Sequence, residues 1–230
     1  TVQLDTAGNA SITAADIDNG STDNCSIDSL TVSPAIFGCG DLGTNTVTLT
    51  VTDSSGNSAT CTATVTVEDV IDPVLVNCPA PIVVNNDSGQ CGANVTWTAP
   101  TSTDNCTIDT IFSDQPNGGF FATGTTPVTY IVLDQSGNSD TCGFTVTVLD
   151  AENPVLACPV DTVFTADTAS CSATVGWNLP TITDNCGVDT VYNNISPGTS
   201  LPVGVATVTY YAEDTSGNLD SCSFNVTVNA

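Results

Sequence analysis

The sequence predicts an all-β fold made of tandem β-sandwich repeats of about 80 residues. Two short markers recur along the chain with the same spacing. The turn D-x-S-G-N begins at Asp53, Asp134 and Asp214, and each copy leads into a cysteine and an alternating strand. The tetrapeptide T-D-N-C ends at Cys25, Cys106 and Cys186. Successive copies of both markers lie 81 and then 80 residues apart, which indicates a tandem array.

The predicted strands alternate apolar residues with threonine and other small polar residues. This period of two is clear in Thr46–Thr52, Ala93–Trp97, Thr207–Ala212 and Phe224–Val228. It is typical of antiparallel sheets with one buried face. Gly, Asn, Asp, Pro and Ser interrupt the chain at short intervals, which favours a sandwich of short strands, and no window has helical periodicity.

Acidic segments mark the boundaries between repeats. Glu68–Pro73 separates the first repeat from the second, and Ala151–Pro154 opens the third. We therefore predict a truncated repeat over 1–69 and complete repeats over 70–150 and 151–230. Residue 1 falls inside a repeat, so we expect the sequence to be a segment of a longer chain. It contains neither a secretory leader nor an apolar run of membrane-spanning length.

The charge is entirely negative. The chain has 25 acidic residues, no Lys, Arg or His, and a formal net charge of −25. Nucleic acid and anionic lipid are excluded as partners because both require basic side chains, whereas cations suit this surface. Catalysis is not expected: nucleophile–base pairs lack a His or Lys, and every candidate Asp recurs beside turn residues.

The 11 cysteines indicate an oxidising compartment outside the cytosol. Zinc is disfavoured because the chain has no C-x-x-C pair and no His. We therefore expect an extracellular, cell-surface protein whose cysteines form disulfides.

The ordered motifs C-P, C-x-A-x-V-x-W, T-D-N-C, V-T-Y and D-x-S-G-N-x-x-x-C resemble the hyalin repeat (HYR). The resemblance covers the second and third repeats from end to end. The first repeat is a divergent relative that keeps D-N-C and D-x-S-G-N but lacks the Trp and the second-strand Cys. The family implies an immunoglobulin-like sandwich used in extracellular adhesion. Tandem versions rich in Thr and Asp look like the stalks of giant surface adhesins of gliding bacteria.

In an immunoglobulin-like sandwich the first and last strands are parallel neighbours, which places certain cysteines close together. The expected pairs are Cys78–Cys142, Cys158–Cys222, Cys91–Cys106, Cys171–Cys186 and Cys25–Cys39. The partner of Cys61 is expected upstream of this segment. Four cysteines in one repeat allow three connectivities, so other pairings stay open at this point.

The same topology brings the T-D-N-C loop, the D-x-S-G-N turn and the incoming linker to one pole of each repeat. The first junction would collect Glu68, Asp69, Asp72, Asp104, Asp134 and Asn138. The second would collect Asp150, Glu152, Asp184, Asp214 and Asn218. Ca²⁺ takes six to eight oxygen ligands, so we hypothesise one Ca²⁺ that stiffens each junction. The alternative is that the turns are only turns and the acids are only solvated.

The function predicted from these patterns is that of a non-catalytic extracellular stalk segment of a repetitive cell-surface adhesin, used for surface attachment or gliding motility. Its expected partners are the neighbouring repeats of the same long chain and an unknown surface ligand. A self-assembling fibre or sheath subunit and a glycan- or protein-binding module are the alternatives. A binding face should expose clustered aromatics, and Phe120 and Phe121 are the loop aromatics, whereas Trp97 and Trp177 are expected in the core. Asp-Ser/Thr motifs resembling bacterial O-glycan acceptors occur at Thr6, Ser29, Thr110, Thr162, Thr168 and Thr190.

Overall fold

The computed structural model describes all 230 residues and divides them between two compact units. The first unit contains residues 1–80, 98–116 and 128–144, and the second contains residues 81–97, 117–127 and 145–230. The division passes through the second repeat. Each of the two junctions marked by the sequence therefore lies inside a single unit.

The first repeat pairs a four-stranded sheet with a two-stranded one. The larger sheet has the order β1-β6-β5-β3, and the smaller contains β2 and β4. The strands are β1 (Val2–Gln3), β2 (Asn9–Ser11), β3 (Ile27–Ser33), β4 (Ile36–Gly38), β5 (Gly43–Asp53) and β6 (Ser58–Glu68).

The second repeat has the same larger sheet, in the order β11-β13-β14-β8, with two small sheets, β10-β7 and β12-β9. Its strands are β7 (Val74–Val76), β8 (Ile82–Asn85), β9 (Gly92–Asn94), β10 (Thr101–Thr103), β11 (Ile108–Ser113), β12 (Phe120–Ala122), β13 (Gly124–Asp134) and β14 (Ser139–Leu149).

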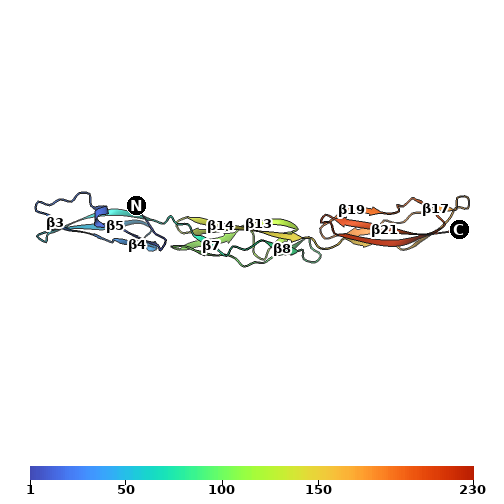
Figure 1. Cartoon of the computed structure of the whole chain (residues 1–230), viewed down its shortest axis with the longest axis horizontal. Coiled ribbons are helices and arrows are strands. Elements are labelled where there is room, and N and C mark those ends of the chain that lie inside the picture. Colours follow the sequence, from blue (N-terminus) through green and yellow to red (C-terminus); the bar gives the residue numbers. More distant parts are fainter. The chain divides into compact units, whose positions relative to one another are not determined.

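The third repeat copies this arrangement with sheets β16-β22-β21-β19, β15-β18 and β17-β20. In Figure 1, β19 runs beside β21, with Tyr192 opposite Tyr211 in the register. The strands are β15 (Val155–Ala157), β16 (Thr162–Thr165), β17 (Ser172–Thr174), β18 (Thr181–Thr183), β19 (Val188–Asn193), β20 (Ser200–Pro202), β21 (Gly204–Asp214) and β22 (Leu219–Asn229).

The first strand of each larger sheet lies parallel to the last. The pairs are β1 with β6, β8 with β14, and β16 with β22, whereas the remaining partners given by the register are antiparallel. This parallel edge pair distinguishes an immunoglobulin-like sandwich from a simple meander. The prediction of tandem immunoglobulin-like β-sandwich repeats is confirmed.

The core of the third repeat contains the inward residues of the alternating strands. It is formed by Ala173, Val175, Val208, Tyr210, Phe224, Val226 and Val228. Trp177 packs against this cluster at a ring-centroid distance of 5.3 Å from Phe224, edge to face, and its Nε1–H donates to the Tyr210 hydroxyl at 3.0 Å. Trp177 is therefore a core residue with a satisfied polar atom, as predicted.

Two short helical segments were not expected, and both lie in the divergent first repeat. The helix α1 covers Ala14–Ile17, and the 3₁₀ turn η1 covers Cys39–Asp41. Asp16 caps α1 by accepting from the Thr13 N–H and hydroxyl, both at 2.7 Å. Such a turn depends on capping rather than on periodicity, so the strand pattern gave no sign of it. No helix has the length and apolarity needed to cross a bilayer.

The structure forms four disulfides. Cys78–Cys142 and Cys158–Cys222 lie within repeats and are the pairs expected from the parallel edge strands. Cys39–Cys106 and Cys91–Cys186 instead join neighbouring repeats, with Cα atoms 5.5 Å and 4.7 Å apart. Cys25, Cys61 and Cys171 are free and exposed.

Three expected pairs are therefore wrong, namely Cys25–Cys39, Cys91–Cys106 and Cys171–Cys186. The third repeat gives the reason. Cys171 adjoins Val203, just before β21 begins, whereas the Cys186 loop leads into β19, whose Val188 pairs with Asp214 at the end of β21. A strand of 11 residues spans roughly 35 Å, and a disulfide tolerates only about 7 Å between Cα atoms. Cys171 and Cys186 lie at opposite ends of their repeat. Each can therefore form a disulfide only with a cysteine of a neighbouring repeat.

We predict that peptide mapping of the unreduced protein finds Cys39 linked to Cys106 and Cys91 linked to Cys186. Because the chain has no Lys or Arg, trypsin cannot digest it, and a protease that cleaves at acidic residues is suitable. A bond from any of these four cysteines to a cysteine of its own repeat would contradict this connectivity. The pairs Cys78–Cys142 and Cys158–Cys222 provide the internal reference.

We predict that Val226→Ala lowers the free energy of unfolding by about 2 kcal/mol, because two buried methyl groups are replaced by a cavity. Val226 is fully buried, whereas Val205 in the same sheet is 68% exposed and serves as the matched control. Urea denaturation monitored by Trp fluorescence measures both variants. An equal, small loss in the two variants would contradict the assignment of the core.

Candidate cation sites at the repeat junctions

Three carboxylates converge in the first compact unit. Asp69 follows β6 in the linker, Asp104 follows β10, and Asp134 ends β13. One carboxylate oxygen from each lies within 4.8 Å of the others. Asp69 and Asp134 are buried, at 6% and 4% exposure. The linker and two loops of the second repeat thus place three acids at one point.

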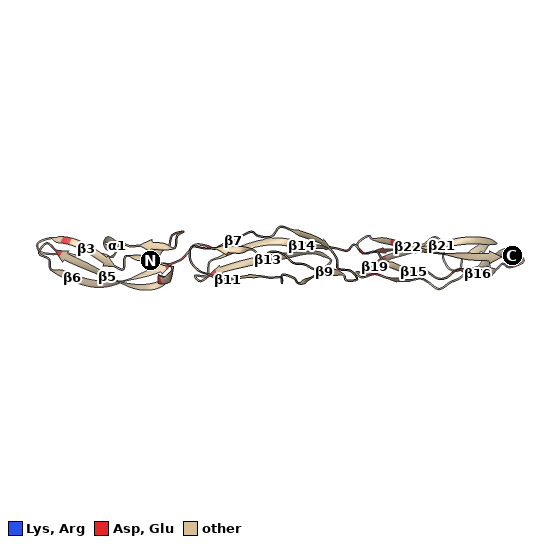
Figure 2. Ribbon diagram, turned by 90° about the horizontal axis from the view of Figure 1, so that it is seen from below, with Lys and Arg blue, Asp and Glu red and all other residues tan.

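The second unit repeats this trio with Asp150, Asp184 and Asp214, whose oxygens also lie within 4.8 Å of one another. Asp214 is 2% exposed and the other two are half-buried. In Figure 2 the acidic residues are red, and no blue appears because the chain contains no Lys or Arg. Neither trio has a basic side chain to balance its charge.

The D-x-S-G-N turn fixes the third carboxylate of each trio. Asp214 Oδ1 accepts from the backbone N–H groups of Ser216 and Asn218, both at 2.8 Å, and Oδ2 accepts from Asn218 Nδ2 at 2.7 Å. Gly217 adopts a φ of +89°, which favours glycine at this position of the turn. Asp134 makes the same set of contacts with Ser136 and Asn138.

The same asparagine also ties the turn to the linker. Asn218 Nδ2 donates to the backbone oxygen of Asp150 at 3.2 Å, and Asn138 Nδ2 donates to that of Asp69 at 3.2 Å. Both asparagines were predicted as metal ligands. The structure places their Nδ2 groups as donors that position the acids.

Burial acts to raise the pKa of Asp214, but hydrogen bonds from Asn218, Ser216 and Gly217 outweigh it and hold the pKa below its ordinary value. The turn therefore keeps this buried carboxylate charged. In the first repeat, Asp53 makes the same contacts in an exposed turn, and the Asn57 side chain is the main cause of its lowered pKa.

The Asn of T-D-N-C is a site residue that the sequence interpretation missed. Asn105 Nδ2 donates to Asp69 Oδ1 at 3.0 Å and to the backbone oxygen of Asp5 at 3.3 Å. Asn185 Nδ2 donates to the backbone oxygen of Gln90 at 3.0 Å and to Asp150 Oδ1 at 3.4 Å. The motif therefore supplies three groups: an Asp to the trio, an Asn that donates a hydrogen bond to the preceding repeat, and a Cys that forms a disulfide with the preceding repeat. Its threefold recurrence was the available signal.

Several oxygens at these sites are buried and accept no hydrogen bond. In the first trio they are Asp69 Oδ2, Asp104 Oδ1 and Asn105 Oδ1, and in the second they are Asp150 Oδ2 and Asp184 Oδ2. A buried carboxylate oxygen without a donor is costly unless a cation neutralises it. The atoms available as metal ligands are all oxygens, and oxygen is the ligand atom that Ca²⁺ prefers.

Besides the two asparagines, three of the acids predicted as ligands lie outside the trios. Glu68 is the exposed last residue of β6, where its side chain points away from the buried face, and Asp72 is exposed three residues beyond Asp69. The Glu152 carboxylate accepts from the Gly89 N–H at 3.0 Å and 2.9 Å, which holds the linker against the second repeat. The linkers therefore contribute one acid each to a trio.

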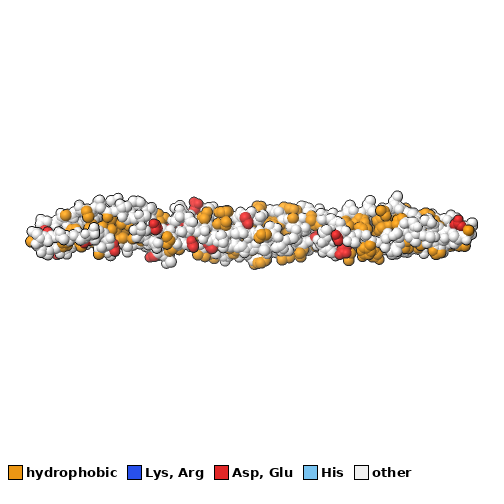
Figure 3. Space-filling model, turned by 90° about the horizontal axis from the view of Figure 1, so that it is seen from above, with side chains coloured by type: hydrophobic (Ala, Val, Ile, Leu, Met, Phe, Trp, Pro, Cys, Tyr) orange, Lys and Arg blue, Asp and Glu red, His pale blue; other side chains and the backbone are white.

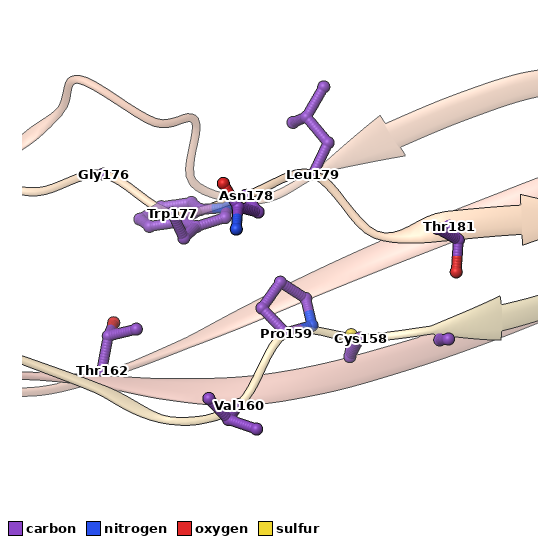
Figure 4. Close-up of a pocket in the computed structure, with 10 residues that line it drawn as sticks. Cys158, Pro159, Val160, Thr162, Gly176, Trp177, Asn178, Leu179 and Thr181 are labelled. Atoms are coloured by element: carbon purple, nitrogen blue, oxygen red, sulfur yellow. The ribbon is translucent and has the colours of Figure 1, made fainter.

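A shallow hollow on the third repeat is lined by residues without charge. In Figure 4, Trp177 and Pro159 face one another across it, while Leu179 and Val160 point outward. The other lining residues carry a hydroxyl, an amide, a disulfide sulfur or no polar side-chain group. The hollow thus offers apolar contact and no acid–base pair.

The predicted aromatic pair and acceptor hydroxyls have varied environments. Phe121 is buried in β12 at 4% exposure, so only Phe120, at 52%, is available on the surface. Thr6, Ser29, Thr168 and Thr190 are exposed, whereas Thr110 is half-buried. The Thr162 hydroxyl is buried without a partner, which disfavours modification there. Glycosylation at the other positions stays a prediction.

The HYR domain family model matches residues 68–148 and 149–228. The chain belongs to the HYR domain family. It is 38% identical over 198 residues to hyalin of Strongylocentrotus purpuratus, a match that covers 82% of this chain and 16% of the relative. It is also 38% identical over 195 residues to hyalin of Lytechinus variegatus, covering 82% of this chain and 37% of that protein.

A further relative is the sushi, von Willebrand factor type A, EGF and pentraxin domain-containing protein 1 of Rattus norvegicus. It is 32% identical over 162 residues, covering 66% of this chain and 4% of the relative. The HYR chain thus spans less than two fifths of the relatives it matches. It is an array of extracellular HYR repeats, in keeping with its four disulfides.

We predict that Asn218→Ala raises the pKa of Asp214 in calcium-free buffer, because the variant loses the side-chain donor to Oδ2. A folded pKa below the unfolded value of about 3.9 stabilises the protein above that pH, and this stability is lost as the pH falls through the folded pKa. The variant should therefore be less stable at neutral pH, and the difference should shrink below about pH 4.

Carboxyl ¹³C NMR titration measures the pKa, and urea denaturation at several pH values measures the stability. Asn178→Ala is the control, because Asn178 is exposed on the same repeat and has no role in the turn. An unchanged Asp214 titration in Asn218→Ala would refute the assigned role of the turn.

Proposed function

We propose that this HYR array is a non-catalytic stalk segment of a repetitive extracellular adhesion protein, and that one Ca²⁺ at each junction stiffens it. The proposal takes residues 1–69, 70–150 and 151–230 as successive modules. The observation that carries it is the trio Asp69, Asp104 and Asp134, which joins a linker to two loops and leaves buried oxygens without donors.

The electrostatic argument favours a bound cation over a plain turn. Two carboxylates about 4 Å apart repel by about 4 kcal/mol at an effective dielectric of 20, and a trio contains three such pairs. The chain holds no Lys, Arg or His that could offset this repulsion. A divalent ion coordinated by the trio replaces repulsion with attraction and supplies the missing partner of each buried oxygen.

Stiffening follows from where the ligands originate. In each trio one acid comes from the linker and two come from the loops of the following repeat. A shared ion therefore fixes the linker to the module that it enters. The inter-repeat disulfides Cys39–Cys106 and Cys91–Cys186 add a covalent tie at the same joints. A junction held by both a bound ion and a disulfide suits a segment that bears force rather than one that catalyses a reaction.

The surface has acidic but no basic side chains. Figure 3 shows apolar side chains in scattered groups among polar and acidic ones, with no basic residue on this face. Phe112 and Tyr192 are half-exposed at equivalent positions of the second and third repeats, and Tyr192 stacks on Tyr211 at a centroid distance of 5.0 Å. A cell-surface setting in gliding bacteria stays a prediction from the family resemblance.

We predict that Ca²⁺ binds with a dissociation constant on the order of 10⁻⁴–10⁻³ M, one ion per trio. Asp104→Asn should remove or weaken one site by about tenfold or more, and Asp184→Asn the other, because each loses a charged ligand while the Asn can still accept from the backbone N–H. Isothermal titration calorimetry measures both.

Asp109→Asn and Asp189→Asn are the matched controls, since both acids are exposed, stand five residues after the trio Asp, and lie outside the trios. Equal affinities in the trio variants and the controls would contradict the assigned sites. No heat of binding up to millimolar calcium would reject the calcium proposal altogether.

We further expect small-angle scattering to show a larger radius of gyration and a less flexible chain when calcium is added. The double variant Asp104→Asn/Asp184→Asn should not respond. If the wild-type scattering profile is the same with calcium and with chelator, the stiffening proposal is overturned. The calorimetric measurement of calcium binding is independent of that result.

A further inference from the structure

Two disulfides of this chain have the same construction, and both join one repeat to the next. In Cys39–Cys106 and Cys91–Cys186 the C-terminal partner is the cysteine of T-D-N-C. The N-terminal partner lies at the strand pair β2/β4 or β9/β12, at the far end of the preceding repeat. In the first pair Cys39 follows β4, beside Gly8, whereas in the second Cys91 precedes β9, beside Thr123. The N-terminal cysteine therefore lies next to different strands of the equivalent strand pair in the two disulfides, but both disulfides join the same ends of the repeats.

Cys171 occupies the place of Cys91, one repeat later. It directly precedes β17, as Cys91 directly precedes β9. The Val203 N–H donates to the Cys171 oxygen at 3.2 Å, and the Thr123 N–H donates to the Cys91 oxygen at 3.3 Å. Cys171 is nevertheless free and exposed. The third repeat thus carries an unused copy of the N-terminal half of the joint.

Cys25 occupies the place of Cys106 and Cys186. Its N–H donates to Asp23 Oδ1 at 2.7 Å, and the Cys186 N–H donates to Asp184 Oδ1 at 2.7 Å. The loop meets the D-x-S-G-N turn through the Ser54 N–H and the Ser26 oxygen at 3.2 Å, matching the contact of Thr215 with Gly187 at 3.4 Å. Cys25 is also free and exposed. The first repeat carries an unused C-terminal half.

The neighbouring asparagine supplies a second match. Asn105 and Asn185 each donate to a backbone oxygen of the preceding repeat, beside the disulfide. Asn24 stands at the same position of T-D-N-C and is exposed. The Gln90 backbone oxygen, which accepts from the Asn185 amide, lies one residue before Cys91. Ser170 holds the equivalent position, one residue before Cys171. A repeat that presents Asn24 and Cys25 therefore offers both contacts that the Cys171 end would receive.

We propose that the free thiols of Cys171 and Cys25 are the two halves of a third inter-repeat joint. Cys171 accepts the D-N-C end of another HYR repeat, and Cys25 bonds the corresponding end of a preceding one. For this chain alone, the partner is a second copy, joined head to tail. The inference deepens the proposed stalk by naming what its ends bind, and it does not require calcium.

The bond forms by thiol–disulfide exchange with a small-molecule disulfide such as oxidised glutathione. The Cys171 thiolate attacks one glutathione sulfur and releases the other glutathione as a thiolate. The Cys25 thiolate of the second copy then attacks the Cys171 sulfur of the mixed disulfide and releases the second glutathione. The two cysteines lose two protons and two electrons in total, and one oxidised glutathione becomes two reduced molecules.

A joint between two different ends is heterologous, so it leaves a free end on every product and continues without closing. Oxidised wild-type protein should therefore form a ladder of linear oligomers. Cys61 is the internal control. It is equally free and exposed, but it stands where Cys142 and Cys222 bond within their own repeats, so it is not part of a joint.

The decisive experiment uses two full-length variants, Cys25→Ala/Cys61→Ala and Cys171→Ala/Cys61→Ala, in a glutathione redox buffer. Each variant alone keeps one half of the joint and should stay monomeric. An equimolar mixture should give a single disulfide-linked dimer on a non-reducing gel, and peptide mapping should identify Cys171 bonded to Cys25. The Cys61→Ala variant should still form the ladder.

Homodimers of either variant alone, in amounts equal to the mixed dimer, would mean random oxidation of exposed thiols and would overturn the proposal. Absence of the mixed dimer would also overturn it. Repeating the mixture with a calcium chelator separates the two proposals, because failure of the cation sites leaves the Cys171–Cys25 bond unchanged. In longer protein from the native source, the peptide bonded to Cys171 shows whether its partner belongs to the same chain or to another copy.

Discussion

The convergence of like charges where repeats meet is the constraint on which the rest of this structure depends. Each junction brings one linker carboxylate against two loop carboxylates, in a chain that has no positive side chain. Such an arrangement is stable only if every charge is held by donors or by a cation. The D-x-S-G-N turn meets part of this need, since it surrounds Asp214 with three N–H donors. The remaining oxygens lack donors, and this deficit points to a divalent ion.

The same short motif serves the fold, the charge and the covalent connection. In T-D-N-C the Asp joins the trio, the Asn reaches a carbonyl of the preceding repeat, and the Cys bonds to it. One motif per repeat therefore supplies the loop side of a joint, whereas the linker acid and the second cysteine come from other segments. Chains of this kind can lengthen by duplication, because each new copy brings both the loop that docks and the end that receives it.

Each junction contains a disulfide and a trio of acids. The first unit contains Cys39–Cys106 and the first trio, and the second contains Cys91–Cys186 and the second trio. Residues of adjacent repeats are thus bonded to one another at each junction. The hydrogen bonds from Asn105 Nδ2 to the Asp5 oxygen and from the Gly89 N–H to the Glu152 carboxylate also cross the junctions. The hydrophobic packing nevertheless lies within a repeat, as the core of the third repeat shows.

The sequence by itself determined the strands, the repeats and the family, because period-two alternation and fixed motif spacing are local properties that survive without knowledge of the fold. It also determined that Asp69, Asp104 and Asp134 would meet, since parallel first and last strands bring those loops to one pole. Only the tertiary structure decided which cysteines bond. Whether Cys91 reaches Cys106 or Cys186 depends on the length of an intervening strand and on the approach of the next repeat. The tertiary structure likewise excluded Glu68, Asp72 and Glu152 from the trios, because the direction of a linker side chain depends on packing that sequence spacing does not record.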